Sequence, residues 1–235
     1  MKPIVVLRNE HDAPSGYLGD ALDRRTLDWN VVRLDAGDPL PKAADVSGVA
    51  VLGGAMSVFD EEEFPFLIGE KRFLRDCVSA GVPVLGICLG CQMLADALGG
   101  RAYRADAGEV VFDPIDLTRD GHDDPVIAAL AGRRVIRFHQ DTFDVPPGAT
   151  ALATGGGFDQ AFRLGSAIGI QPHPEVTPDL LSGWLGSGTG RDVAIRFGTD
   201  PDGLLAEFSA AEEEAAATAS AVFEAWIDEV VHSAG

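Results

Sequence analysis

The stretch Val84-Leu85-Gly86-Ile87-Cys88-Leu89-Gly90-Cys91-Gln92 joins an apolar strand directly to the start of a helix. Cys88 lies at that joint, where the free amides of the helix's first turn and the positive end of its dipole stabilise a thiolate. Glycines at positions 86 and 90 leave room for a tight turn that lifts the cysteine clear of the sheet. The serine of the G-x-S-x-G nucleophile elbow is presented in the same way. The pattern therefore predicts Cys88 as a nucleophile.

Apolar strands alternate with helical stretches on the N-terminal side of this joint. Short continuous apolar runs predict parallel strands buried on both faces, and apolar positions three and four apart predict helices between them. The predicted strands are residues 4–7, 31–34, 48–52 and 84–87, and the predicted helices are residues 18–29, 66–78 and 89–98. The alternation predicts a three-layer α/β fold, with a mostly parallel, flavodoxin-like sheet, helices on both faces and right-handed crossovers.

After Gly99-Gly100 the sequence changes to short strand-like runs separated by glycine, proline and aspartate. These runs are residues 108–118, 134–139, 150–154, 160–164 and 166–171, with one short helix near residues 126–130. Because no linker interrupts them, we expect an antiparallel extension of the same sheet and not a second domain.

The tail, residues 199–235, carries nine acidic residues and no lysine or arginine. Asp200 followed by Pro201 is typical of a helix start. Apolar residues then recur on one helical face. We expect an acidic helical extension that packs on an α/β domain of residues 1–198 with its charged face in solvent. A helix that docks a partner protein is the alternative.

The composition describes a folded and strongly acidic chain. Of 235 residues, 46% are hydrophobic, and 18 basic against 37 acidic residues give a net charge of −19. This charge opposes phosphate backbones and anionic lipid, so we expect neither nucleic acid nor membrane as a partner. The apolar run at the N-terminus is too short for a secretory signal, and three cysteines are too few for a disulfide framework. A cytoplasmic protein with reduced thiols is predicted.

A thiolate nucleophile needs a base, and the base needs a group that orients it. The segment QPHPE (171–175) contains His173 between two stiffening prolines, with Glu175 two residues further on. Cys88, His173 and Glu175 therefore form a candidate triad in which the carboxylate fixes the orientation and tautomer of the imidazole. His139 is the competing base.

A reacting carbonyl also needs donors for its developing oxyanion. The amide of Leu89 directly follows the nucleophile and points into the elbow. The second donor is expected from another loop at the carboxyl ends of the strands, where open α/β sheets bind ligands. The glycine pair in LGGAM (52–56) ends the third predicted strand and can turn its amides outward.

Cys88 and Cys91 also form a C-x-x-C motif, which is a different hypothesis: thiol–disulfide exchange. That interpretation gives no role to Gln92, to the glycine pair or to the His173–Glu175 segment. A zinc site is disfavoured because no second Cys/His pair has ligand spacing.

Three segments occur in an order and spacing that resemble the class I glutamine amidotransferases. They are GGAMSVFD (53–60), GVPVLGICLGCQMLADALGG (81–100) and QPHPEVTP (171–178). The resemblance covers most of residues 1–185. Within this family, the chain is most similar to free-standing proteins that resemble the glutaminase domain of GMP synthase. The segments that carry this similarity are HQDTFDVPPGA (139–149) and the run that ends in DQAFR (159–163).

The resemblance implies a role for each site residue. Cys88 would attack the side-chain amide of glutamine, His173 would shuttle protons, and Glu175 would hold His173. Backbone amides of Gly54 and Leu89 would bind the oxyanion, after which ammonia leaves and water hydrolyses the γ-glutamyl thioester. The implied substrate-binding positions are Gly53, Gln92, His139, Gln140 and Asp141. No cofactor or metal is implied.

The chain departs from the family pattern at three positions. Cys91 replaces a small residue, Gln140 stands where glycine is common, and Val111 replaces a glycine. Gln140 bears on whether glutamine itself is the substrate.

The residues after Leu185 are too few to build the synthetase that would consume the ammonia. We therefore expect either a separate acceptor subunit or a stand-alone hydrolase of γ-glutamyl amides. A non-catalytic binding or regulatory subunit is the third hypothesis.

Overall fold

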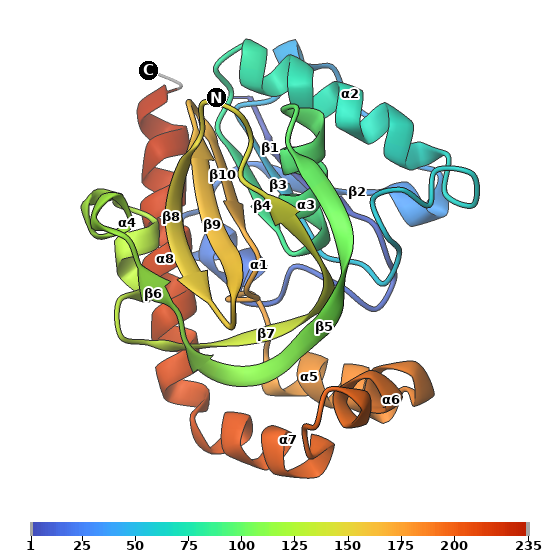
Figure 1. Ribbon diagram of the computed structural model, residues 1–235. Helices are drawn as coiled ribbons and strands as arrows, with labels where there is room; N and C mark the ends of the chain where they lie inside the picture. The colour runs from blue at the N-terminus through green and yellow to red at the C-terminus, as the bar shows by residue number, and fades with distance from the viewer. Residues whose placement is uncertain (1, 234–235) are drawn as a thin grey trace.

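An eight-stranded sheet, in the order β2-β1-β3-β4-β10-β9-β8-β6, runs through the molecule (Figure 1). The computed structural model describes residues 2–233. Strands from β2 to β10 pair in parallel, and β9, β8 and β6 continue the sheet in antiparallel fashion. The strands are β1 (Ile4–Arg8), β2 (Trp29–Arg33), β3 (Gly48–Val51), β4 (Val84–Ile87), β6 (Asp116–Leu117), β8 (Thr150–Gly155), β9 (Phe158–Leu164) and β10 (Ala167–Ile170).

Helices cover both faces of this sheet. Side chains alternate along β1, so that Ile4 and Val6 join one buried cluster with α1 (Gly16–Arg24) and α8 (Glu212–Ser233). Val5 and Leu7 join another with α2 (Phe66–Ser79) and α3 (Leu89–Ala97). The predicted three-layer α/β fold is confirmed. The short helices are η1 (Leu34–Ala36), η2 (Ala43–Asp45), α4 (Arg119–Asp123) and η3 (Ile127–Leu130).

The second half corrects the expected strand pairing. β5 (Arg101–Pro114) and β7 (Arg134–Asp144) form a separate two-stranded sheet, so residues 108–114 and 134–139 do not extend the central one. The two strands curve past the ends of the central strands (Figure 1). Their side chains Val110, Phe112 and Ile136 pack in a third buried cluster, whereas Val135 and Phe143 of β7 still join the clusters of the central sheet. β10 also pairs in parallel with β4, which the antiparallel expectation missed.

The third cluster is completed by helices that follow the last strand: α5 (Pro178–Gly186), α6 (Gly188–Arg196) and α7 (Pro201–Ala210). The sequence pattern did not predict α5 or α6. The Asp200 side chain accepts a hydrogen bond from the Asp202 amide at the start of α7. Within α8, Trp226 is fully buried among core residues of the sheet. The division at residue 198 therefore stays a prediction, since the last helix shares the main core.

The first predicted helix ends sooner than its apolar stripe suggested. α1 stops at Arg24, and Thr26 takes a positive φ of 54°. Trp29, expected on the helix, begins β2, and its indole donates to Asp23 Oδ1 at 2.8 Å. The indole therefore packs on α1 although Trp29 belongs to β2, which explains why Trp29 fitted the helical spacing of the apolar residues.

Within residues 2–233, every helix is too short or too polar for a bilayer span.

Candidate active site

Cys88 links β4 to α3 with a backbone conformation that few residues other than glycine adopt. Its φ is 52° and its ψ is −108°. A Cβ on Gly86 would lie 2.4 Å from the Gly90 carbonyl oxygen, and a Cβ on Gly90 would lie 2.3 Å from that of Val51. The positive φ of Cys88 is backbone strain, which costs about 1–3 kcal/mol and persists where surrounding packing imposes it, typically at functional sites. The backbone therefore has the tight turn that the sequence predicted.

His173 follows β10, and its ring approaches the cysteine from the neighbouring strand. A Cβ on Gly53 would lie 3.3 Å from His173 Cε1 and 3.8 Å from Cys88 Cβ, so the two side chains converge over this glycine. Nδ1 of His173 is 2.7 Å from Oε1 of Glu175. Nε2 is buried and has no other hydrogen-bond partner among the described residues. This nitrogen is therefore the one available for proton transfer.

The charges around His173 favour its protonated form. Burial by itself lowers the pKa of the imidazole, but the Cys88 sulfur and the Glu175 carboxylate oppose it and hold the pKa well above 6.5. An imidazolium beside the sulfur stabilises a thiolate, which is the nucleophilic form of cysteine.

Several backbone contacts fix the His173–Glu175 segment. The His173 amide donates to the Ile136 carbonyl of β7 at 2.8 Å, and the Trp184 ring packs edge-on with its centroid 5.0 Å from the imidazole. The Glu175 carbonyl accepts from the Tyr17 amide at 3.0 Å. Gly16, with φ +46°, allows this approach, because a Cβ there would lie 2.0 Å from the Glu175 oxygen. Sequence reasoning missed Gly16 and Trp184, since neither lies near a motif.

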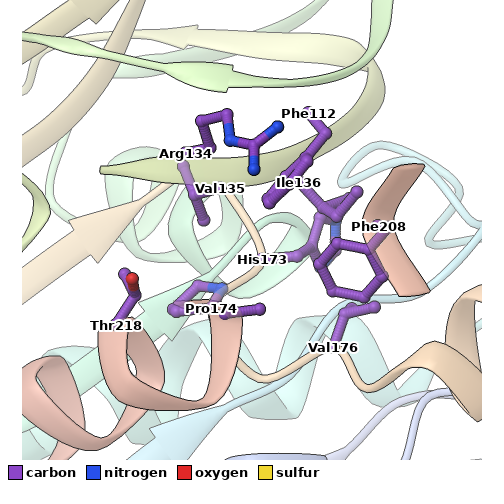
Figure 2. A pocket seen from close by; sticks show the side chains of 10 residues that line it. Phe112, Arg134, Val135, Ile136, His173, Pro174, Val176, Phe208 and Thr218 are labelled. Atoms are coloured by element: carbon purple, nitrogen blue, oxygen red, sulfur yellow. The ribbon is translucent and has the colours of Figure 1, made fainter. Parts of the chain in front are cut away.

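A small cavity of about 10 Å³ lies behind His173. Figure 2 shows the imidazole there with Pro174, Phe208 of α7 and Thr218 of α8. The helices of the acidic tail therefore pack directly against the loop that carries the histidine.

The two predicted oxyanion donors belong to adjacent loops. A Cβ on Gly54 would lie 2.9 Å from Leu89 Cδ2, which shows how closely the loop after β3 approaches the first residue of α3. Gly54 follows Gly53 at the end of β3, next to the convergence of Cys88 and His173. Two backbone amides beside one nucleophile are the arrangement that an oxyanion hole requires.

A chain of hydrogen bonds leads from Gln92 to the cysteine. Gln92 Nε2 donates to the Asp141 carbonyl at 2.7 Å and to Gln171 Oε1 at 3.2 Å. Gln171 Nε2 in turn lies 3.5 Å from the Cys88 sulfur. Gln171 is fully buried, and its place in the QPHPE segment did not indicate this role. Gln92 is thus part of the support of the cysteine, and its contact with substrate stays a prediction.

His139, the competing base, has no nitrogen left for proton transfer. Nε2 lies 3.1 Å from Glu109 Oε2, and Nδ1 lies 3.1 Å from the Asp141 carbonyl. Glu109 also accepts from Gln160 at 2.8 Å and pairs with Arg137 at 3.2 Å. These contacts make His139 a member of a buried polar network.

Gln140 and Asp141 are likewise engaged by the protein. Gln140 Oε1 accepts from Arg196 at 2.8 Å. Asp141 accepts from Arg104 at 2.9 Å and from the Ser57 hydroxyl, which ties the loop after β3 to β7. Their predicted substrate contacts remain predictions.

Cys91 differs sharply from Cys88. It is fully buried in the core on the α2–α3 face, and burial, with smaller contributions from Cys88 and Asp159, raises its pKa well above 9.0. A Cβ on Gly169 of β10 would lie 2.8 Å from its sulfur, so the thiol packs against the sheet. A buried thiol of raised pKa is a poor partner for disulfide exchange. This argues against the redox hypothesis.

The fold and the site together define a class of protein: an α/β domain with a cysteine elbow, a histidine and a glutamate at the carboxyl end of a parallel sheet. The family model described as glutamine amidotransferase class-I matches residues 11–182. The chain belongs to this family, as its resemblance predicted.

Individual proteins agree with this assignment. The glutamine amidotransferase-like protein YfeJ of Salmonella typhimurium is 31% identical over 193 residues, covering 79% of this chain and 80% of that protein. One subunit of the glutamine-hydrolysing GMP synthase of Haloarcula marismortui is 36% identical over 141 residues, covering 58% of this chain and 68% of that protein. The crystal structure of a Thermotoga maritima glutamine amidotransferase superposes with a TM-score of 0.85 at 27% identity, covering 97% of this chain and 98% of that one.

Proposed function

We propose that the protein hydrolyses the side-chain amide of glutamine through a thioester on Cys88. The observation that carries this is the convergence of Cys88 and His173 over Gly53, with Nε2 of the histidine free of other partners among the described residues. The Cys88 thiolate attacks the amide carbon, and the amides of Gly54 and Leu89 stabilise the oxyanion. His173 gives its proton to the departing ammonia and then takes one from the water that hydrolyses the thioester.

Glu175 acts on the histidine and not on the substrate. Its short contact with Nδ1 keeps the opposite nitrogen, Nε2, directed toward the sulfur. All three cysteines of the chain are free. We also infer a cytoplasmic location, since the reaction requires a reduced Cys88 and the cytoplasm keeps thiols reduced.

The decisive experiment labels the nucleophile. We expect a glutamine-like electrophile, such as a diazoketone analogue of glutamine, to form an adduct on Cys88 that mass spectrometry locates. Cys88→Ala should abolish labelling and turnover, whereas Cys91→Ala should keep most of both. Preferential labelling of Cys77 or Cys91 would overturn the proposal, and an unlabelled protein would favour a non-catalytic subunit.

We further propose that the released ammonia passes to a separate synthetase chain. The Haloarcula relative, which by its name is one subunit of a GMP synthase, supports this. Glutamine hydrolysis by the isolated chain tests it. If the isolated chain hydrolyses glutamine slowly and an added acceptor subunit raises the rate of hydrolysis, the two-subunit hypothesis is supported. Ordinary turnover without any partner, with kcat of about 1–10³ s⁻¹, supports a stand-alone hydrolase.

A further inference from the structure

Strands β5 and β7 carry two arginine–aspartate pairs whose members lie directly opposite each other. Arg101 faces Asp144 in the register of the two strands, and Arg104 faces Asp141. In each pair the arginine Nε contacts a carboxylate oxygen, at 2.8 Å in the first pair and 2.9 Å in the second. The pairs are three residues apart, so their side chains leave opposite faces of the two-stranded sheet. The same chemistry therefore occurs in two environments on one pair of strands.

The Arg101–Asp144 pair is an ordinary surface ion pair. Both side chains are more than half exposed, at 66% and 52%. The Arg101 guanidinium lies over the Tyr103 ring, 4.3 Å from its centroid, and its hydrogen bond goes to Asp144 alone among the described residues. Exposed pairs of this kind contribute little, because water and salt screen them.

The Arg104–Asp141 pair differs because its carboxylate is nearly buried and a third side chain joins it. The Asp141 side chain is only 11% exposed. Nη2 of Arg104 donates to Oγ of Ser57 at 2.8 Å, and the buried Ser57 hydroxyl donates to the second carboxylate oxygen of Asp141. The single hydroxyl proton of Ser57 and one of its lone pairs are thus both used. The three side chains form a closed ring of hydrogen bonds, which we call the Arg104 clamp.

The Arg104 clamp joins β5, β7 and the loop after β3. Ser57 lies three residues after Gly54 in this loop, and its amide donates to Asp60 Oδ2 at 2.7 Å. On β5, Arg104 is the last residue in register before residues 105–108 shift the pairing with β7. Such an irregularity interrupts the ladder of backbone hydrogen bonds. The clamp therefore connects the segments at the point where the backbone ladder stops.

Two members of the clamp lead to the candidate active site. Ser57 belongs to the loop whose Gly54 amide is a predicted oxyanion donor. The Asp141 carbonyl accepts from Gln92 at 2.7 Å, at the start of the hydrogen-bond chain that ends at the Cys88 sulfur. A shift of the loop against β7 would therefore move the oxyanion donor relative to the sulfur.

We propose that Arg104 is a positioning residue of the hydrolysis, which locks Ser57 to Asp141 and so holds the loop after β3 in place relative to Cys88. The inference rests on the proposed function. Arg104 acts through these two residues and not by contact with the reacting atoms. Small displacements of catalytic groups reduce the rate strongly, since the reacting atoms must be aligned near contact distance. Arginine suits this role because its planar fork contacts two acceptors at fixed angles, which a lysine ammonium does not.

The test compares Arg104→Ala with Arg101→Ala, which removes the same type of pair from the same two strands. We expect Arg104→Ala to lower kcat for glutamine hydrolysis about tenfold and Arg101→Ala to change it less than about twofold. Steady-state ammonia release measures kcat, with circular dichroism to show that both variants are folded. Unchanged kcat in Arg104→Ala, or an equal loss in the two variants, would overturn the positioning role while the hydrolase function stands. Absence of turnover in the wild-type protein, together with an unlabelled Cys88, would overturn the hydrolase function itself.

A second measurement separates alignment of the oxyanion donors from a general disturbance of the site. Alkylation of Cys88 by iodoacetamide requires the thiolate but forms no oxyanion. Its rate in Arg104→Ala should therefore stay within about twofold of the wild-type rate, because the histidine and the helix dipole set the reactivity of the thiolate. Mass spectrometry follows the adduct on this cysteine. Alkylation that slows as much as hydrolysis would contradict a role in alignment.

Ser57→Ala opens the same clamp from the side of the loop and keeps the Arg104–Asp141 pair. Because both changes break one ring, the double variant Ser57→Ala/Arg104→Ala should lose no more kcat than the larger of the two single losses. Losses that multiply in the double variant would show that the two residues act separately. Arg104→Lys keeps the charge but not the fork, and it should still lose about threefold in kcat. Full kcat in Arg104→Lys would overturn the clamp, since the charge alone would then suffice.

Discussion

The structure contains two buried histidine–carboxylate pairs, His173–Glu175 and His139–Glu109, and they differ in what the second imidazole nitrogen does. His173 binds Glu175 through Nδ1 and leaves Nε2 beside Cys88 without another partner among the described residues. His139 uses both nitrogens, one on Glu109 and one on the Asp141 carbonyl. The same residue types therefore give a reactive group in one place and a structural support in the other. The free nitrogen, and not burial or the carboxylate, distinguishes the two.

The pairs are also connected. The Asp141 carbonyl that receives His139 also receives Gln92, and Gln92 reaches Gln171 and then the Cys88 sulfur. We therefore expect the His139–Glu109 pair to affect the reaction only by helping to position the hydrogen-bonded residues that contact Cys88.

The largest difference is expected when each histidine is replaced by glutamine. His173→Gln removes the proton-transfer group and should lower kcat for glutamine hydrolysis about 10³–10⁴-fold. His139→Gln displaces only a support and should lower kcat about tenfold or less. Steady-state ammonia release measures both, with circular dichroism to show that each variant is folded. A larger loss for His139→Gln would reverse the assignment of the base.

Replacing the two carboxylates should affect different properties, because Glu109 contributes mainly to stability and Glu175 mainly to activity. Glu109→Gln leaves Arg137, which is 5% exposed, without its counter-charge, and should lower the free energy of unfolding by about 3–5 kcal/mol. Glu175→Gln should instead lower kcat about 10²–10⁴-fold, because the imidazole loses the negative charge that fixes its tautomer and stabilises its protonated form. Urea unfolding and ammonia release on the same two variants test this. The comparison fails if Glu109→Gln is the variant that loses kcat without losing stability.

What the sequence predicted of these regions was local. The elbow at Cys88 depends on neighbouring glycines, and the proximity of His173 to Glu175 depends on two residues of separation. Buried parallel strands are short continuous apolar runs that the local sequence shows directly, so the strands in the first half of the sheet were also predicted.

What the sequence could not predict depends on contacts between distant segments. Gln171 and Cys88 are 83 positions apart, and nothing near either indicates the other. The pairing of β5 with β7 is equally non-local, because a short apolar run does not show which strand it will join. Gly16 had no motif around it, although Glu175 could not approach α1 without it.

The two pairs also differ in how their contribution to the stability of the fold depends on pH, and this effect is smaller. The raised pKa of His173 gives stability that is fully present below 6.5 and lost as the pH rises through the folded-state value. Glu109 behaves in the opposite way: burial raises its pKa, but His139 and Arg137 outweigh burial and lower it. Its contribution is present above 4.5 and lost as the pH falls through the folded-state value.

Replacing the sulfur tests the first of these. Cys88→Ser removes the neighbour that raises the pKa of His173, so the pKa of this imidazole should fall. NMR of the His173 ring protons against pH, in the wild-type protein and in Cys88→Ser, measures this change. An unchanged pKa of His173 would show that the sulfur and the ring do not interact.

The smallest effect concerns a third buried carboxyl, Glu70, which is fully buried and forms no salt bridge among the described residues. Burial raises its pKa to about 8, against smaller opposing effects of Asn9 and Lys71. The folded protein keeps this proton between pH 4.5 and about 8 while the unfolded chain loses it, so stability falls as the pH rises through that window. Glu70→Gln should remove this slope and raise the free energy of unfolding at pH 8 by at least about 1 kcal/mol, measured by urea unfolding. A destabilised Glu70→Gln protein at pH 8 would instead show that Glu70, like Glu109, is needed in its charged form by a neighbour such as Lys71.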